Sequence, residues 1–331
     1  MRRALEQARR GLGRTTPNPV VGASIVTDEG VVVGDGAHER AGEPHAEVHA
    51  LNEAGERARG ATLYCTLEPC SHTGRTGPCT ERIIAAGIRR VVAAMEDPFP
   101  LVRGRGFAAL RAHGIVVDEG LGREEAVRLN QPFLTAVRDG RPFVIVKAAA
   151  SLDGRIARAP GERTPITSVE ANRRVQYLRA QVDAIGVGSE TVLADDPLLT
   201  VRDVYRERPL IRVIFDRRRR TPASARVFST IKDGPVLVIG SRGEDLQSVL
   251  RHLASEGVQS LLLEGGAQIH AAAWDAGLVD YVQLFLAPVA LGPAGVPLFG
   301  GRPWSMSSLI DPKVELLGPD TLIEGYVHRP H

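Results

Sequence analysis

Three short stretches, His45-Ala46-Glu47, Glu68-Pro69-Cys70 and Pro78-Cys79, decide how the first half of this chain is interpreted. Together they offer an imidazole, two thiols and a carboxylate, which is a suitable donor set for a tetrahedral zinc site. Structural zinc sites use four protein ligands, whereas catalytic sites keep three and leave the fourth position to water or substrate. With three good ligands and one extra carboxylate, the pattern predicts a catalytic metal site.

The spacing also assigns a role to each of these residues. His-x-Glu followed by Pro-Cys and a second Cys is typical of zinc deaminases, in which the Glu is the acid/base and not a ligand. We therefore expect His45, Cys70 and Cys79 to bind zinc. Glu47 follows His45 too closely to be a comfortable co-ligand and is expected to move the protons. Cys79 is predicted to open a helix, whose dipole would lower the pKa of its thiol.

This region contains two further residues of types that can bind zinc, His49 and Cys65. His49 lies four residues after His45 and shares its helix face, so it is an alternative ligand. We rank it lower, because the motif sets Glu47 relative to His45. Cys65 lies in an apolar, strand-like stretch and is expected to be a small buried hydrophobe.

Length and composition limit the class of protein. A chain of 331 residues with 43% hydrophobic and 24% charged residues predicts about two ordinary domains. The net charge of +2 falls short of the basic balance of nucleic-acid binders, and no apolar run approaches the ~18 residues of a membrane span. The N-terminus has no apolar signal core, and three cysteines favour a reducing compartment. We expect a cytoplasmic protein with no nucleic-acid or membrane partner.

Helical and strand patterns alternate through the first 140 residues and end at a cluster of turn residues, 139–142. They predict a three-layer α/β domain over 1–141, and we assign 142–331 to a second domain. The predicted helices cover 1–11, 104–113 and 123–138, with others beginning at Pro44 and near Pro78, and the strands cover 20–26, 31–33, 61–67, 89–95 and 115–117.

The pattern restarts in the second half, and alternation of this kind is typical of an α/β domain with a largely parallel sheet. A helix is predicted over 169–180, and two antiparallel strands, 314–317 and 322–327, are expected to close the sheet. The other predicted strands are 143–150, 184–188, 211–215, 236–239, 259–263 and 281–286.

Three features of the second half suggest a nucleotide site. Glu264-Gly265-Gly266-Ala267 is a glycine turn before a helix, suited to phosphate, although it is not Gly-x-Gly-x-x-Gly. A polar loop is predicted over 189–202 after a buried strand, where ligands of open α/β sheets bind. The run Arg217 to Arg220 is either solvated surface, as such runs usually are, or a grip on the 2′-phosphate of NADP.

Over nearly its whole length the chain resembles the bifunctional deaminase/reductase family of riboflavin biosynthesis. Eight residues separate Cys70 from Cys79, as in that family, whereas deaminases of nucleosides and nucleic acids carry Pro-Cys-x-x-Cys. The motifs that carry the resemblance lie at 17–22, 42–47, 66–72, 74–76, 79, 147–155, 166–168, 191–202 and 264–266.

The resemblance implies a cytidine-deaminase-like domain followed by a dihydrofolate-reductase-like α/β domain. It implies two successive reactions with the cofactors Zn²⁺ and NADPH. A diaminopyrimidine ribosyl phosphate loses an amino group by hydrolysis, and NADPH then reduces the ribosyl group to a ribityl chain. Two rivals are less favoured: a nucleic-acid deaminase with an accessory domain, and a zinc-stabilised nucleotide sensor, which has no use for Glu47. We also expect a homo-oligomer.

The resemblance further assigns residues to the two sites. Where the family usually has Gly-Glu-Ser-x-Trp-Ile-Thr, this chain has Gly161 to Thr167 without the aromatic, which leaves the contacts at 163 and 165 open. Lys147 and Asp195 are expected near the reacting sugar carbon, and Arg179 or Arg202 at the substrate phosphate. The first substrate is expected to contact Asn18, His38, His72 and Arg75; the reductase substrate Lys147, Arg163, Arg179, Asp195, Leu199, Arg202 and Glu264; and NADPH Ala149, Pro165, Thr167, Thr191, Asp195, Arg217, Gly266, Ala267, Gln268, Ile269 and His270.

Overall fold

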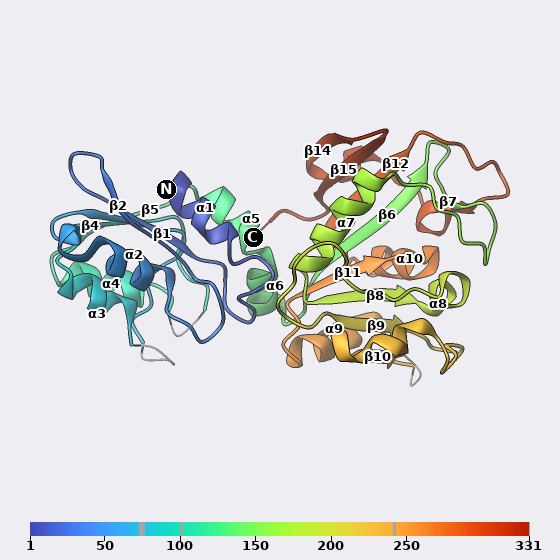
Figure 1. The fold of residues 1–331 in the computed structure, drawn as a ribbon, viewed down its shortest axis with the longest axis horizontal. Coiled ribbons are helices and arrows are strands. Elements are labelled where there is room, and N and C mark those ends of the chain that lie inside the picture. The colour runs from blue at the N-terminus through green and yellow to red at the C-terminus, as the bar shows by residue number, and fades with distance from the viewer. Residues whose placement is uncertain (73–76, 100–101, 241–242, 331) are drawn as a thin grey trace. The chain divides into compact units, whose positions relative to one another are not determined.

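A computed structural model describes the chain except for residues 73–76, 100–101, 241–242 and 331. The chain divides into two compact units, Met1–Asp139 and Gly140–Pro330, which are shown in Figure 1. No described helix is long and apolar enough to cross a membrane.

A five-stranded mixed sheet with the order β2-β1-β3-β4-β5 forms the centre of the first unit. β1 pairs antiparallel with β2 and β3, and β3, β4 and β5 run parallel. The elements are α1 (Arg2–Arg9), β1 (Gly22–Val26), β2 (Val32–Ala37), α2 (Ala46–Ala54), β3 (Thr62–Cys65), α3 (Cys79–Ala85), β4 (Arg90–Ala93), α4 (Arg105–Ala112), β5 (Val116–Glu119), α5 (Arg123–Leu129) and α6 (Gln131–Asp139), with a 3₁₀ turn at Gly55–Ala58.

Two glycines show that helices cover both faces of this sheet. A Cβ at Gly22 would lie 2.0 Å from the carbonyl oxygen of Ala4 in α1, and a Cβ at Gly36 would lie 2.0 Å from that of Ala46 in α2. Gly36 pairs with Ala23, the neighbour of Gly22, so the two glycines face opposite sides of the pleated sheet. The expected three-layer arrangement is therefore present, and the absence of side chains lets each helix backbone approach the sheet.

An eight-stranded sheet with the order β10-β9-β8-β11-β6-β12-β15-β14 forms the second unit. The first six strands are parallel, and β15 and β14 join antiparallel, as the sequence predicts. The elements are β6 (Phe143–Ser151), β7 (Arg155–Ala157), α7 (Val169–Gln181), β8 (Ala184–Gly188), α8 (Ser189–Asp195), β9 (Ile211–Phe215), β10 (Val236–Ile239), α9 (Leu246–Ser255), β11 (Ser260–Glu264), α10 (Ala267–Asp275), β12 (Tyr281–Ala287), β13 (Val296–Pro297), β14 (Ile310–Leu317) and β15 (Asp320–Tyr326), with 3₁₀ turns at Arg226–Asp233, Leu298–Gly301 and Met306–Ser308.

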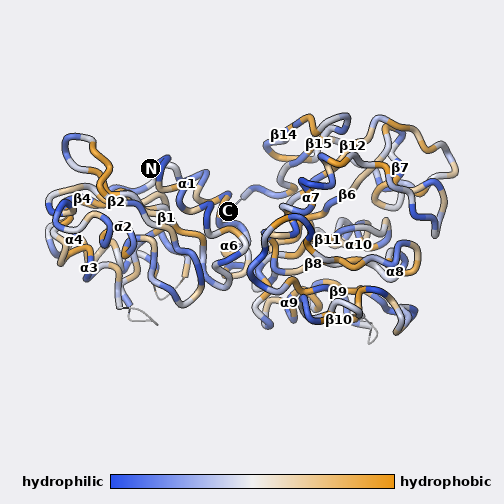
Figure 2. Tube along the Cα trace, viewed as in Figure 1, coloured by the Kyte–Doolittle hydropathy of each residue, from blue (hydrophilic) through white to orange (hydrophobic). Residues whose placement is uncertain are grey.

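Alternate residues of β6 enter two different hydrophobic clusters. Val144 and Val146 pack in the cluster that contains α9, whereas Phe143 and Ile145 pack in the one that contains Leu178 of α7. Because successive side chains of a strand point to opposite faces, helices cover both faces of the central sheet. Hydrophobic colour runs along strands of both units in Figure 2, and polar colour gathers in the loops.

Two predicted elements differ from the structure. The helix predicted over 123–138 is two helices, α5 and α6, interrupted at Asn130, whose side chain bonds the backbone N–H and C=O of Val20. The loop predicted over 189–202 begins with a helix, α8, because the polar residues at its start form helical turns after β8.

Candidate active sites

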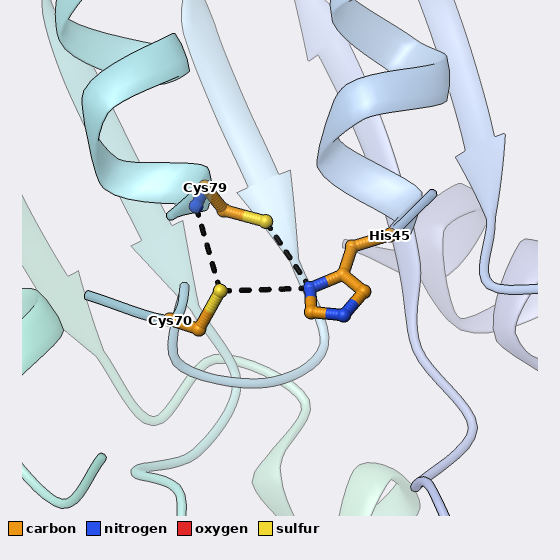
Figure 3. A group of neighbouring side chains, drawn as sticks. All are labelled: His45, Cys70 and Cys79. Atoms are coloured by element: carbon orange, nitrogen blue, oxygen red, sulfur yellow. Dashed lines mark hydrogen bonds between the residues drawn. The ribbon is translucent and has the colours of Figure 1, made fainter. Parts of the chain in front are cut away.

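Three separate elements of the first unit supply the metal ligands. His45 is the N-cap residue of α2, Cys70 follows β3 in a loop, and Cys79 is the first residue of α3. Their ligand atoms all lie within 4.8 Å of one another (Figure 3). Among the described residues, this is the group of His, Cys, Asp and Glu side chains that could hold a metal ion.

The distances in this cluster suit zinc. His45 Nδ1 lies 3.3 Å from Cys79 Sγ and 3.6 Å from Cys70 Sγ. Zinc bonds of ~2.0 Å to nitrogen and ~2.3 Å to sulfur, at tetrahedral angles, put a nitrogen and a sulfur ligand ~3.5 Å apart. The backbone N–H of Cys79 also donates to Cys70 Sγ at 3.4 Å, which orients the second thiol. The three residues therefore fit a zinc ion with one open position.

The two thiols differ in acidity when no ion is present. Hydrogen bonds from Cys79 and His45 lower the pKa of Cys70 to about 4. The thiolate of Cys70 and burial raise the pKa of Cys79. With no ion present, the hydrogen bond between the two thiols favours the thiolate at Cys70, and the lowered pKa expected at Cys79 from the helix dipole stays a prediction. A bound dication favours the thiolate form of both.

Glu47 lies in the first turn of α2, two residues after the metal ligand His45. Its side chain is 3% exposed, and Oε2 has no hydrogen-bond partner among the described residues. Burial is the main cause that raises the pKa of Glu47 to about 7. A carboxyl group that can take up and release a proton near neutrality suits general acid/base catalysis.

Of the four residues predicted to bind the first substrate, His38 lies beside His45 and Asn18 contacts His38. His38 is 2% exposed, and its ring meets the His45 ring edge-on with centroids 5.3 Å apart. Asn18 Nδ2 lies 3.0 Å from His38 Nε2. His72 is exposed two residues after Cys70, and Arg75 lies outside the described residues.

The two competing residues of the first unit are also accounted for. His49 is half-buried and is not part of the ligand cluster, although its Nε2 has no partner among the described residues. Cys65 is fully buried in the hydrophobic core, as predicted.

Glu68 belongs to the Glu68-Pro69-Cys70 motif, but its structural role in the zinc site was not predicted. This buried carboxylate accepts hydrogen bonds from the backbone N–H groups of Gly104 at 2.9 Å and Gly106 at 2.8 Å, and also from those of Asp97 and Phe107. It therefore ties the start of the Pro69-Cys70 loop to the N-terminus of α4. A charged residue next to a buried strand was the available signal.

The second unit contains a cavity of about 1530 Å³ at the carboxyl ends of its parallel strands. Residues at or just beyond the ends of β8, β9, β10 and β11 line it, together with residues 147–149 of β6, which begin level with the end of β11; this is the usual ligand position in open α/β sheets. Sites for a single small ligand are commonly ~300–1,000 Å³, so this cavity has room for a dinucleotide and a substrate together.

Most residues predicted for the reductase site line this cavity. Glu264 lies just beneath it, bonded to a lining residue. Leu199 is not among the lining residues. Its side chain is 4% exposed and packs in a hydrophobic cluster with Val192 and Leu210, so its contact with substrate stays a prediction. The predicted residues that line the cavity are Lys147, Ala149, Arg163, Pro165, Thr167, Arg179, Thr191, Asp195, Arg202, Arg217, Gly266, Ala267, Gln268, Ile269 and His270.

A charge cluster crosses the floor of the cavity. Arg179 donates from Nε and Nη2 to the two oxygens of Glu264, both at 2.7 Å, and from Nη1 to the carbonyl oxygen of Thr200 at 2.9 Å. Both side chains are nearly buried, and the arginine opposes the effect of burial to lower the pKa of Glu264. Burial lowers the pKa of Lys147, which lies above the ring of Phe285. Arg179 is thus largely occupied by the protein itself.

The glycine turn has the form that the sequence predicts. Gly265 and Gly266 both have left-handed φ angles, 88° and 85°, and α10 begins at the next residue. A Cβ at either glycine would lie 3.3 Å from Thr191 Oγ1, so the turn packs closely on α8. On the other side, the backbone N–H of Gly265 donates to Nε2 of the buried His270 at 3.2 Å. The free N–H groups of α10 suit a phosphate group.

Only part of the arginine run Arg217 to Arg220 lines the cavity. Arg217, Arg218 and Arg220 line the cavity. Arg220 donates to Glu190 at 2.6 Å and to Ser189 at 3.0 Å, so it helps to hold α8. Arg217 is the lining arginine that directly follows Asp216 at the end of β9.

Gln176 is a lining residue that the sequence analysis misses. It lies on α7 three residues before Arg179, so both face the cavity. Helical spacing from Arg179 was the signal that would have found it.

Two family models match the chain, one in each unit. Residues 1–95 match the cytidine and deoxycytidylate deaminase zinc-binding region, and residues 142–327 match the RibD C-terminal domain.

The same similarity extends to whole proteins. The chain is 46% identical to the riboflavin biosynthesis protein RibD of Escherichia coli, with 88% of each chain covered, and 41% identical to that of Aquifex aeolicus, with 98% and 96% covered. Its structure is similar to Acinetobacter baumannii RibD, with a TM-score of 0.87, 38% identity, and 98% and 96% covered. A diaminohydroxyphosphoribosylaminopyrimidine deaminase/5-amino-6-(5-phosphoribosylamino)uracil reductase of Thermotoga maritima gives a TM-score of 0.87 at 37% identity, with the same coverage.

Proposed function

This chain belongs to the RibD family of bifunctional deaminase/reductases of riboflavin biosynthesis, and from that premise we propose which of its residues carry each reaction. The protein hydrolytically deaminates a diaminopyrimidine ribosyl phosphate and reduces the ribosyl group to a ribityl chain with NADPH. The first unit carries the deamination and the second unit the reduction. Support for this division comes from the separate hydrophobic cores and from sites that each lie within one unit.

His45, Cys70 and Cys79 hold the zinc ion of the deaminase. Bound zinc supplies a Lewis acid that makes water available as a nucleophile near neutral pH. Glu47 accepts a proton from the attacking water and delivers it to the departing amine, which needs protonation to leave. The observation that carries this assignment is the unpartnered Oε2 of a buried carboxyl group in the turn that follows a metal ligand.

His38 and Asn18 bind and orient the pyrimidine. His38 Nδ1 lies 3.2 Å from the carbonyl oxygen of Pro44, to which it donates, and Nε2 then accepts from the Asn18 amide. This chain of bonds turns Asn18 Oδ1 away from His38, so that it can accept a hydrogen bond from a ring N–H or amino group. It also fixes the backbone directly before His45.

In the reductase cavity, Arg202 binds the substrate phosphate and Arg179 is a positioning residue. Arg179 gives three of its N–H groups to Glu264 and Thr200, whereas the Arg202 side chain is exposed and has no partner among the described residues. NADPH supplies the hydride when bound. Lys147 and Asp195 are the polar groups near the reacting sugar carbon, and the glycine turn and Arg217 bind the cofactor.

Three finer points belong to the same proposal. We infer a cytoplasmic, homo-oligomeric enzyme whose partners are small molecules and not nucleic acids. The moderate net charge of +2 and the polar cavity support the choice of small molecules.

The test is to mix the zinc-loaded protein with NADPH and the diaminopyrimidine ribosyl phosphate and to follow the nicotinamide absorbance. Wild-type protein should consume NADPH with the aminated or the deaminated substrate. Glu47→Gln should consume it only with the deaminated substrate, since only the first step needs the carboxylate. Undiminished turnover of aminated substrate by Glu47→Gln would overturn the assignment.

A further inference from the structure

One face of α7 borders the reductase cavity. On α7, Gln176 lies four residues after Asn172, three after Arg173 and three before Arg179, and all four residues line the cavity. Gln176 is the buried polar member of this set, with only 8% of its surface exposed. A buried amide must use its polar atoms, because leaving one unpaired costs free energy.

Only one end of the Gln176 amide is used by the protein. Its Oε1 accepts a hydrogen bond from the backbone N–H of Arg202 at 2.9 Å. That bond fixes which way the amide points, so Nε2 carries the two remaining N–H donors. Nε2 has no hydrogen-bond partner among the described residues, and it is not sealed from the cavity.

The surroundings of this donor are positively charged. Arg173 lies three residues before Gln176 on α7, and the backbone of Arg202 is bonded to Gln176. Both arginines line the cavity, and neither side chain has a partner among the described residues. An amide N–H donor beside two guanidinium groups favours an oxygen acceptor with negative charge. A glutamate here would keep the bond to Arg202 but would repel such an acceptor.

We propose that Gln176 binds the phosphate of the reductase substrate, with Nε2 donating to a phosphate oxygen beside the Arg202 guanidinium. The inference rests on the proposed function of this cavity and adds a residue to it. In the same bond network, Oε1 holds the backbone of Arg202, so a single amide binds the ligand and positions its charged neighbour.

Two variants separate these roles. Gln176→Glu retains an oxygen that can accept from the Arg202 N–H and removes the donor. Gln176→Leu removes both. Each is assayed as the full-length, zinc-loaded chain for NADPH affinity, for deamination, and for KM and kcat with the deaminated substrate.

For Gln176→Glu, the expected result is a KM for deaminated substrate raised about tenfold or more, the usual effect of losing a hydrogen bond to a charged group. NADPH affinity and deamination should not change, which shows that the chain is folded. The dephosphorylated substrate, used as a competitive inhibitor, should bind wild type and Gln176→Glu equally well.

Two results would overturn the inference. If Gln176→Glu matches wild type while Gln176→Leu is impaired, the amide only positions Arg202. If Gln176→Glu weakens the dephosphorylated inhibitor as much as the substrate, the acceptor is not the phosphate. A wild-type protein that fails to reduce the deaminated substrate would instead refute the proposed function of the cavity.

Discussion

Arg141 closes the start of the second unit with a nearly buried ion pair. Its Nη1 and Nη2 donate to the two oxygens of Asp280 at 2.6 and 2.7 Å, and the side chains are only 13% and 10% exposed. Asp280 also accepts from the backbone N–H of Val144 at 2.8 Å, at the beginning of β6. The pair therefore anchors the first strand of the sheet to the segment before β12.

We predict that Arg141→Ala destabilises the second unit by about 3 kcal/mol. Removing one partner of a buried ion pair costs ~3–5 kcal/mol, and the low end applies because Asp280 keeps its bond from Val144. For a unit of this size, ~1 kcal/mol shifts the melting temperature by ~2–4 °C, so the expected decrease is ~6–12 °C. The loss should come from the unpaired carboxylate, and not from the missing arginine as such.

Tryptophan fluorescence measures this transition in the full-length chain, because both tryptophans, Trp274 and Trp304, lie in the second unit. The double variant Arg141→Met/Asp280→Asn is the matched control and should recover most of the loss, since the amide oxygen still accepts from the Val144 N–H and no buried charge is left unpaired. A shift below ~2 °C for Arg141→Ala, or no recovery in the double variant, would refute this account of the pair.

Three further predictions concern the two sites. Cys79→Ser should reduce the bound zinc, whereas Glu47→Gln should retain zinc and lose deamination by ~100-fold or more. Zinc analysis and the deaminase assay check both variants. Full zinc occupancy in Cys79→Ser would contradict the ligand assignment. Arg217→Ala should raise the Kd for NADPH about tenfold or more and leave the Kd for NADH unchanged. Arg219→Ala is the control, because Arg219 is not among the residues that line the cavity. Equally weakened binding of both cofactors would mean that the arginine run serves the fold. A fragment beginning at Gly140 should bind NADPH and reduce deaminated substrate without zinc; a cooperatively melting fragment that binds NADPH without reducing the substrate would show that the sites share residues.

The zinc site was predictable because most of its ligands and its acid/base lie in short sequence motifs. His45 and Glu47 are neighbours on one helix turn, and Cys79 opens the next helix, so local structure already orients their side chains. Alternating hydrophobic patterns likewise predicted the sheets, and the fold of a cytidine-deaminase-like domain followed by a reductase-type α/β domain is confirmed. The relative acidity of the thiols was not predictable, because it depends on hydrogen bonds between elements that are distant in sequence.

The reductase cavity was predicted less well because its important pairs are long-range. Arg179 and Glu264 are separated by 85 positions, and neither residue alone indicates that one neutralises the other. Leu199 lies within a polar motif, yet its side chain turns into the core. A motif identifies residues near a site, but only the packing determines which of their atoms face the ligand.

The charge balance of the cavity explains why it affects function which atoms of a motif residue face the ligand. If Arg179 were free, the phosphate would meet the arginine on the helix, and Gln176 would be one polar neighbour among several. Because Glu264 takes two of the Arg179 N–H groups, the phosphate is left to Arg173 and Arg202, which flank Gln176 and whose side chains have no partner among the described residues. The anion is therefore bound at Arg202 and not at Arg179, and the neutral amide of Gln176 becomes part of its binding site. Such a donor adds a directed hydrogen bond without adding charge to a floor that already contains Lys147.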